Sequence, residues 1–170
     1  TMNNDIVNHG QWGCLQSHIN ILEDAIEHNY KIIIILEDDI ILKGKWSNIL
    51  EKLYNIINED KKLIYLGASQ HNWDNIQFTK DYYFANNSTG TFAYMVHCDF
   101  FPVLLNIFKQ KRKPVDNYLT DIQKKYNEKC IVMFPNKIIC NLENSNIGME
   151  RNSEIFFKKF KWDIYEDDTR

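Results

Sequence analysis

Three acidic residues, Glu37, Asp38 and Asp39, directly follow a run of four isoleucines and a leucine at positions 32–36. In open α/β sheets, ligands bind beyond the carboxyl ends of the strands. Adjacent carboxylates there repel one another unless a cation lies among them, and carboxylate oxygens suit Mg²⁺ and Mn²⁺. Side chains alternate in direction along an extended chain, so Glu37 and Asp39 are expected to share one ion. The alternative is that the trio only forms the polar start of a loop.

His18 is a second candidate, and it lies in a segment with helical periodicity. It follows Ser17 and comes four residues after Cys14, which is one turn of a helix. A histidine can bind substrate or transfer protons near neutral pH. A lone histidine on a helix is more often a hydrogen-bonded packing residue, and no neighbour in the sequence marks His18 as a ligand. Both interpretations stay open.

The composition describes one folded domain with a mildly acidic charge. The 170 residues include 20 Lys plus Arg and 23 Asp plus Glu, a net charge of −3, and 44% are hydrophobic. A chain of this size can bury a sufficient core without disulfides or structural metal. The most basic stretch, 109–113, is short, so no nucleic-acid partner is expected. The longest apolar runs are too short to span a bilayer, so no transmembrane segment is expected.

Cysteine spacing and the N-terminus indicate the compartment. The N-terminus does not resemble a signal peptide, and the four cysteines show no C-x-x-C spacing. These features favour a soluble protein of a reducing compartment, the cytoplasm. Asn, Ile and Lys make up 60 of the 170 residues, which indicates an AT-rich genome, that of a bacterium or a large DNA virus.

The first half of the chain alternates between helical and strand patterns. An apolar stripe at steps of three and four predicts a helix over 11–29, and the β-branched run predicts a strand over 31–36 that is covered on both faces. A second helix is predicted over 46–57 and a second strand over 63–66. This alternation favours βαβ units and a mainly parallel sheet.

The second half is predicted to continue with short strands and helices. The strands are expected at 82–85, 91–96, 131–134 and 138–140, and the helices at 99–111, at 116–126 and around 155–162. Asp99 is the predicted N-cap of the first of these helices, and Pro114 separates it from the next. There is no internal repeat and no linker, so the whole chain, 1–170, is expected to form a single domain.

Five short segments carry a family resemblance. They are GQWGCLQSH at 10–18, IIIILEDDIIL at 32–42, YLGAS at 65–69, GTFAYMVH at 90–97 and PVDNYL at 114–119. Together they resemble glycosyltransferase family 25, which includes bacterial lipooligosaccharide galactosyltransferases and the collagen hydroxylysine glycosyltransferases, and which has relatives in large DNA viruses. The resemblance covers about residues 10–140, so 142–170 is expected to be a C-terminal extension.

The resemblance implies a GT-A fold, in which a Rossmann-like, mainly parallel sheet flanked by helices binds a nucleotide sugar. Glu37, Asp38 and Asp39 occupy the position of the acidic metal-binding motif of such enzymes. A bound Mn²⁺ or Mg²⁺, with Asp39 as a ligand, would bridge the diphosphate of a UDP-sugar and neutralise the charge that develops on the departing UDP. The oligomeric state stays unknown.

The resemblance also implies inversion at the anomeric carbon, which needs a base for the proton of the acceptor hydroxyl. Asp116, which follows the break at Pro114, is the predicted catalytic base. The alternative role for Asp116 is the N-cap of the helix that follows. Capping and catalysis do not exclude each other.

Other residues in the matching segments are predicted to bind substrate. These are Ser17, His18, Gly67, Gly90 and Thr91. A glycine permits close approach of the backbone to a sugar or phosphate, but Gly67 is more simply a strand end and Gly90 could form a tight turn. His97 and Trp73 are weaker candidates for the acceptor side, because such residues usually lie in the core or on the surface.

The chain departs from the family pattern in three places. Only nine residues precede Gly10, where relatives have a strand with a basic run, and 144–147 read Asn-Ser-Asn-Ile without the acid that relatives often carry. No histidine follows His97 to act as a third metal ligand, so water and diphosphate would complete the shell. The motifs favour an active enzyme that transfers glucose or galactose to a glycan or a hydroxylated protein side chain. The missing strand favours an inactive nucleotide-sugar-binding or assembly subunit.

Overall fold

The computed structural model describes residues 6, 8–142 and 153–165 as a mixed α/β protein. The central sheet has five strands in the order β1-β7-β3-β8-β5. These are β1 (Ile32–Leu36), β7 (Ala93–His97), β3 (Leu63–Tyr65), β8 (Cys130–Met133) and β5 (Tyr82–Phe84). Two small sheets pair β2 (Ile40–Leu42) with β9 (Ile138–Cys140) and β4 (Ser69–Gln70) with β6 (Ser88–Thr89).

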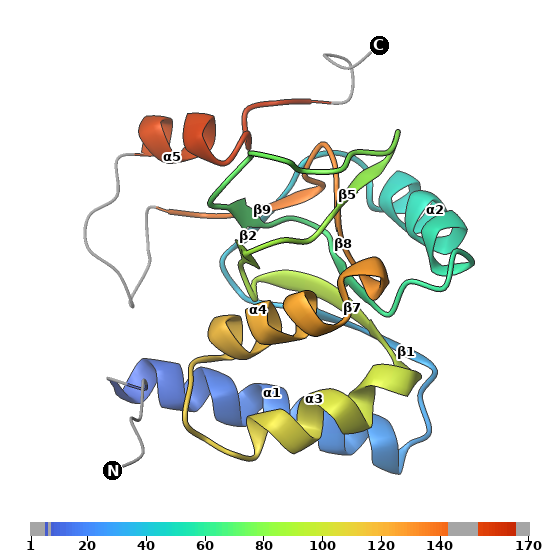
Figure 1. Ribbon diagram of the computed structural model, residues 1–170, viewed down its shortest axis with the longest axis vertical. Coiled ribbons are helices and arrows are strands. Elements are labelled where there is room, and N and C mark those ends of the chain that lie inside the picture. The colour runs from blue at the N-terminus through green and yellow to red at the C-terminus, as the bar shows by residue number, and fades with distance from the viewer. Residues whose placement is uncertain (1–5, 7, 143–152, 166–170) are drawn as a thin grey trace.

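Helices cover both faces of the central sheet (Figure 1). They are α1 (His9–Glu27), α2 (Trp46–Ile57), α3 (Phe101–Phe108), α4 (Val115–Lys125) and α5 (Ser153–Lys159). Helices α1, α3 and α4 contact one another and share a core with one face, whereas α2 and the segment after α5 belong to the core on the other face. Along β3, Leu63 and Tyr65 point into the first core and Ile64 into the second. The expected sheet with flanking helices is confirmed.

Helix α1 forms where the apolar stripe predicts it, shifted by two residues toward the N-terminus. Its first turn is capped by Asn8, whose side chain accepts a hydrogen bond of 2.9 Å from the backbone N–H of Gln11. The stripe buries Leu15, Ile19 and Leu22. This packing fixes α1 against the sheet, and it thereby also fixes the orientation of the other side chains of α1.

The prediction of a mainly parallel sheet is wrong. Among the described strands, only β3 and β8 pair in parallel, while β1–β7, β3–β7 and β5–β8 are antiparallel. The crossover through α2 does make β1 and β3 run in the same direction, but β7 inserts between them and runs the opposite way. Strand β1 therefore lies at the sheet edge, and Ile32 and Leu36 are exposed rather than covered.

The helix predicted over 99–111 is shorter, and Asp99 is not its N-cap. A 3₁₀ turn, η1 (Cys98–Phe100), precedes α3, and the helix ends at Phe108. Instead of capping, the Asp99 carboxylate forms an ion pair of 2.7 Å with Lys62. Asp99 has the residue type of an N-cap, but its carboxylate pairs with a lysine from a distant segment, which the local sequence could not indicate.

A buried polar network positions the chain before β7. Gln123 of α4 donates from Nε2 to the carbonyl of Ser88 at 2.7 Å and accepts from the backbone N–H of Ser88 at 3.0 Å. The Ser88 hydroxyl in turn donates to the side chain of Gln70. These bonds hold β4 and β6 together and fix the turn that leads to Gly90.

The described C-terminal residues, 153–165, pack on the second core. Helix α5 confirms the predicted C-terminal helix, and Phe160 and Trp162 after it are only 2% exposed. The Trp162 indole N–H donates to the carbonyl of Ala68 at 2.8 Å. The Asn-Ser-Asn-Ile stretch at 144–147 lies outside the described residues. None of the helices in the described part is long and apolar enough to cross a membrane.

Candidate active site

A cleft of about 830 Å³ opens beyond the carboxyl end of β1. Its walls include Glu37, Asp38 and Asp39 after β1, the Gly90-Thr91 pair before β7, and Asp116 of α4. These six residues come from three separate segments of the sequence, and each was predicted to belong to the site. The antiparallel insertion of β7 brings its start beside the end of β1, because Leu36 pairs with Ala93.

Glu37 is held in a fixed position by β7 and its preceding turn. Its backbone N–H donates to the carbonyl of Phe92 at 2.9 Å, and its Oε1 accepts a hydrogen bond of 2.6 Å from the Thr91 hydroxyl. Burial raises the pKa of Glu37, the Thr91 hydrogen bond opposes this rise, and the charges of Asp39 and Asp116 add to it. Thr91 therefore contacts a neighbouring carboxylate as well as lining the cleft.

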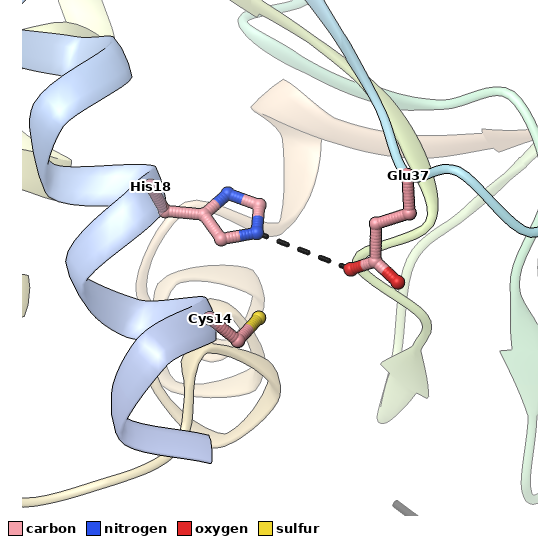
Figure 2. Close-up of side chains that lie close together, drawn as sticks. All are labelled: Cys14, His18 and Glu37. Carbon is pink, nitrogen blue, oxygen red and sulfur yellow. Dashed lines mark ion pairs between the residues drawn. The ribbon is translucent and has the colours of Figure 1, made fainter. Parts of the chain in front are cut away.

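His18 lies behind Glu37 and is not among the residues that line the cleft. It is 3% exposed, stacks on the ring of Tyr94 and shares a hydrogen bond of 2.7 Å between its Nδ1 and the Tyr94 hydroxyl. Burial lowers the pKa of His18 to about 4, so the ring is neutral at physiological pH. Its Nε2 faces Glu37 at 4.0 Å (Figure 2). These contacts agree with the interpretation of His18 as a packing residue. Because His18 does not line the cleft, it could influence a substrate only through Glu37 or through a bound ion.

The side chains of the three acids after β1 lie in different environments. The chain turns at 38 and 39, so the alternation expected of an extended strand does not apply there. Asp38 is exposed, whereas Asp39 accepts a hydrogen bond of 3.3 Å from the Cys140 thiol at Oδ2. The Oδ1 atom of Asp39 is buried and has no hydrogen-bond partner among the described residues. A buried carboxylate oxygen without a donor is costly unless a cation meets it, so Asp39 fits the expected metal ligand.

The described residues do not gather Glu37, Asp38 and Asp39 into a compact group. Potential ligand atoms of three residues within 4.8 Å of one another occur instead at Cys14, His18 and Glu37, on α1 and after β1 (Figure 2). Cys14 lines the cleft, and burial, followed by the charges of Glu37 and Asp116, raises the pKa of its thiol to about 11. The thiol is therefore protonated while no cation is bound.

Asp116 is not the N-cap of α4, which corrects one of its two predicted roles. The cap position is Pro114, without a side-chain hydrogen bond, and Asp116 lies in the first turn. Its Oδ1 accepts a hydrogen bond of 2.8 Å from the backbone N–H of Gly90, and this is the one hydrogen bond of the Asp116 carboxylate in the described part of the chain. Burial raises the pKa of Asp116, opposed by the Gly90 hydrogen bond and by the His71 imidazole in its protonated form.

Gly90 adopts a conformation that other residues avoid. Its φ is +117°, and a Cβ added there would lie 2.4 Å from the ring of Phe92. The glycine therefore permits both the turn into β7 and the approach of its N–H to Asp116. This explains why the Gly-Thr pair precedes the strand.

Besides His18, two further predicted substrate-binding residues lie outside the cleft lining. Ser17 is exposed on α1, and Gly67 is buried where a Cβ would lie 1.7 Å from the carbonyl oxygen of Ile138. Close backbone packing is thus sufficient to explain Gly67. The weaker acceptor candidates also lie elsewhere, because His97 pairs with Ile32 at the opposite end of β1 and Trp73 stacks on Phe78.

Several cleft residues were not predicted from the sequence. Besides Cys14, they include His71, Lys159, Phe160 and Trp162. The helical spacing of Cys14 and His18 was a usable signal for Cys14. His71 lies in a polar segment without periodicity, where it bonds to the Thr89 hydroxyl at 2.8 Å. Lys159 and the aromatic residues belong to the segment that was set apart as an extension.

Comparison with protein families provides independent evidence on this cleft. Residues 3–119 match the model of glycosyltransferase family 25, described as an LPS biosynthesis protein. Comparison with curated proteins gives no significant match. The matched region covers more than half of the chain and includes the acidic residues after β1 as well as Asp116 and its partner Gly90. The chain therefore belongs to glycosyltransferase family 25, whose members transfer sugars.

Proposed function

We propose that this protein is a metal-dependent glycosyltransferase that moves a hexose, glucose or galactose, from a UDP-sugar to a hydroxyl group of a glycan or a hydroxylated protein side chain. The observation that carries this proposal is the convergence of four carboxylates, Glu37, Asp38, Asp39 and Asp116, on one cleft. A diphosphate would not enter so acidic a cleft without a cation to offset the charge. The donor and a divalent ion are thus expected to bind together.

Asp39 is the best-placed ligand for that ion, with Glu37 and Asp38 as further candidates. Its buried Oδ1 lacks a partner among the described residues, and all three offer oxygen atoms of the type that Mg²⁺ and Mn²⁺ prefer. When bound, such an ion supplies Lewis-acid stabilisation of the negative charge on the leaving UDP. Lys159, which also lines the cleft, is a candidate for direct contact with a phosphate group.

Asp116 is proposed as the general base of an inverting transfer. Its Oδ1 is held by the Gly90 N–H, which leaves Oδ2 to accept the proton of the acceptor hydroxyl. As that proton moves to Asp116, the acceptor oxygen forms a bond to the anomeric carbon and the bond from this carbon to the diphosphate oxygen breaks. Burial raises the pKa of Asp116, and a carboxylate with a raised pKa is a stronger base once it is ionised.

Calorimetry of UDP binding, with and without Mn²⁺, tests the metal-assisted donor site. The chain is expected to bind UDP much more tightly with Mn²⁺, and Asp39→Ala is expected to remove that difference. Asp99→Ala is the matched control, because Asp99 is paired with Lys62 at the opposite end of β7 and should leave UDP binding unchanged. Equal binding with and without metal would contradict the proposed site.

A product assay with UDP-glucose and UDP-galactose then tests catalysis. The expected result is turnover on a sugar acceptor, or slow hydrolysis of the donor when no acceptor is present. Metal-dependent binding of UDP without either reaction would favour a nucleotide-sugar-binding subunit instead of an enzyme.

A further inference from the structure

We propose that Cys14, His18 and Glu37 form a second binding site, for a thiophilic divalent cation of the Zn²⁺ type. One potential ligand atom of each residue, a thiol sulfur, an imidazole nitrogen and a carboxylate oxygen, lies within 4.8 Å of the other two (Figure 2). This sulfur-nitrogen-oxygen set shares Glu37 with the all-oxygen set proposed for Mn²⁺ or Mg²⁺ but differs from it in chemistry. Sulfur and imidazole ligands select Zn²⁺ over Mg²⁺.

The three ligands stand on well-packed elements. Cys14 and His18 are four residues apart in α1 and therefore share one face of the helix, beside the apolar stripe that contains the buried Leu15 and Ile19. Glu37 is fixed from the other side by its hydrogen bonds to Phe92 and Thr91. The approach of the three side chains thus follows from the packing of α1 on the sheet.

His18 is oriented as a metal ligand would be. Its Nδ1 is engaged with the Tyr94 hydroxyl, so its Nε2 is the nitrogen that faces Glu37. Metal-bound histidines typically have such a partner on the second ring nitrogen. The distance of 4.0 Å from Nε2 to Glu37 Oε1 is too long for a hydrogen bond. Ligands of tetrahedral Zn²⁺ lie about 3.5 Å apart, given metal–ligand bonds of about 2.0–2.3 Å, so the two side chains need to approach only slightly.

The charge around Glu37 also favours a bound cation. Among the residues that the structure describes, Glu37 forms no ion pair with a lysine or arginine, while Asp39 and Asp116 lie close enough to disfavour its charge. A divalent ion held by the Glu37 carboxylate and a Cys14 thiolate would form a site of zero net charge. Cys14 and Glu37 both line the cleft, so the fourth ligand position would be open to water from it.

A second group of three potential ligands in the described chain, a Cys-His-Asp group, offers a contrast. His97, Cys98 and Asp99 also place ligand atoms within 4.8 Å of one another. The Lys62 ammonium, however, lies 2.7 Å from the Asp99 carboxylate and 3.5 Å from His97 Nδ1. A cationic side chain therefore already occupies that group, which makes Cys98 a matched control for Cys14.

Titration of the metal-free protein with Co²⁺, a spectroscopic substitute for Zn²⁺, tests the proposal without reference to enzyme activity. The protein is expected to show thiolate-to-Co²⁺ charge-transfer absorption that saturates at one equivalent and is abolished by excess Zn²⁺. Cys14→Ser is expected to lose this absorption, and His18→Gln is expected to weaken Co²⁺ binding at least tenfold. Cys98→Ser and Cys140→Ser are expected to retain it.

Several outcomes would overturn the proposal. One is a charge-transfer band that survives in Cys14→Ser but disappears in Cys140→Ser, which would place the ion beside Asp39. Another is the absence of any band together with no calorimetric Zn²⁺ binding. A measurement on the unaltered protein does not depend on the folding of a variant. Zn²⁺ is expected to protect Cys14 from alkylation, as measured by mass spectrometry, while Cys98 keeps its reactivity. Equal reactivity of Cys14 with and without Zn²⁺ would also contradict the site.

Discussion

The carboxylates of Glu37 and Asp116 line the same cleft but have different hydrogen-bond partners. Glu37 accepts from the side chain of Thr91, whereas Asp116 accepts from the backbone of Gly90. A backbone donor cannot rotate away, so it fixes one oxygen of Asp116 and leaves the other for a substrate. The sequence could place Glu37 at the end of a strand and Asp116 at the start of a helix after the break at Pro114. It could not reveal these partners, because they come from the turn before β7.

The variant Asp116→Asn, which replaces one carboxylate oxygen with an NH₂ group, tests whether Asp116 is the catalytic base. The asparagine keeps an oxygen that can accept the Gly90 N–H but cannot take up the acceptor proton, so kcat is expected to fall by about 100- to 10,000-fold. UDP binding in the presence of Mn²⁺ is expected to stay unchanged. Turnover equal to that of the unaltered protein would remove Asp116 from the mechanism.

The pH dependence of turnover offers a second test of Asp116. Its pKa is raised, so it loses its proton only at a higher pH than an ordinary aspartate. Activity that needs the ionised form is present above this pKa and is lost as the pH falls through it. The acidic limb of a kcat/KM profile is therefore expected above the usual aspartate range, and the remaining activity of Asp116→Asn is expected to lack that limb.

The elements differ in how far the sequence could predict them. Helix α1 was predictable because the spacing of its apolar residues is a local feature of the sequence. The order of the central sheet was not, because the pairing of β7 with both β1 and β3 joins residues 29 to 65 positions apart and has no signature in any one segment. The insertion of β7 has a functional consequence, since it places Gly90 and Thr91 beside Glu37. Likewise, the contact of Cys14 with Glu37 depends on how α1 packs on the sheet.

The turn before β7 can be tested by exchanging its glycine. Gly90→Ala would force a side chain into the positive-φ region and against the ring of Phe92, so the free energy of unfolding is expected to fall by about 1–3 kcal/mol. The backbone N–H of residue 90, which donates to Asp116, would move with the turn, so turnover is expected to fall as well. Urea denaturation and the product assay measure the two effects.

Gly13→Ala is the matched control for this exchange. Gly13 lies in the exposed part of α1, and an added Cβ would have no atom of another segment within 4 Å. Because alanine favours the helix, stability is expected to rise by up to about 1 kcal/mol. A similar loss of stability in both variants would show that the strain is not specific to the turn.

On the scale of the whole molecule, the described C-terminal residues, 153–165, contribute to the walls of the cleft. Lys159, Phe160 and Trp162 form one wall of the cleft, although the family match ends at residue 119. The sequence indicated an amphipathic helix there but not its location, since the contacts that fix it are long-range. Lys43, just after β2, donates to the carbonyl of Trp162, and to that of Ile164 at 2.7 Å.

Lys43→Met would test whether this attachment shapes the donor site. The methionine keeps most of the aliphatic stem but cannot donate to the two carbonyls, and the loss of such charge-assisted bonds costs about 1–3 kcal/mol. Hydrogen exchange is expected to increase across 153–165, and UDP affinity with Mn²⁺ is expected to weaken because Lys159 and Trp162 lose their fixed positions. Lys45→Met, two residues away on an exposed side chain, is expected to change neither quantity. Faster exchange with unaltered UDP affinity would show that the segment covers the core without contributing to donor binding.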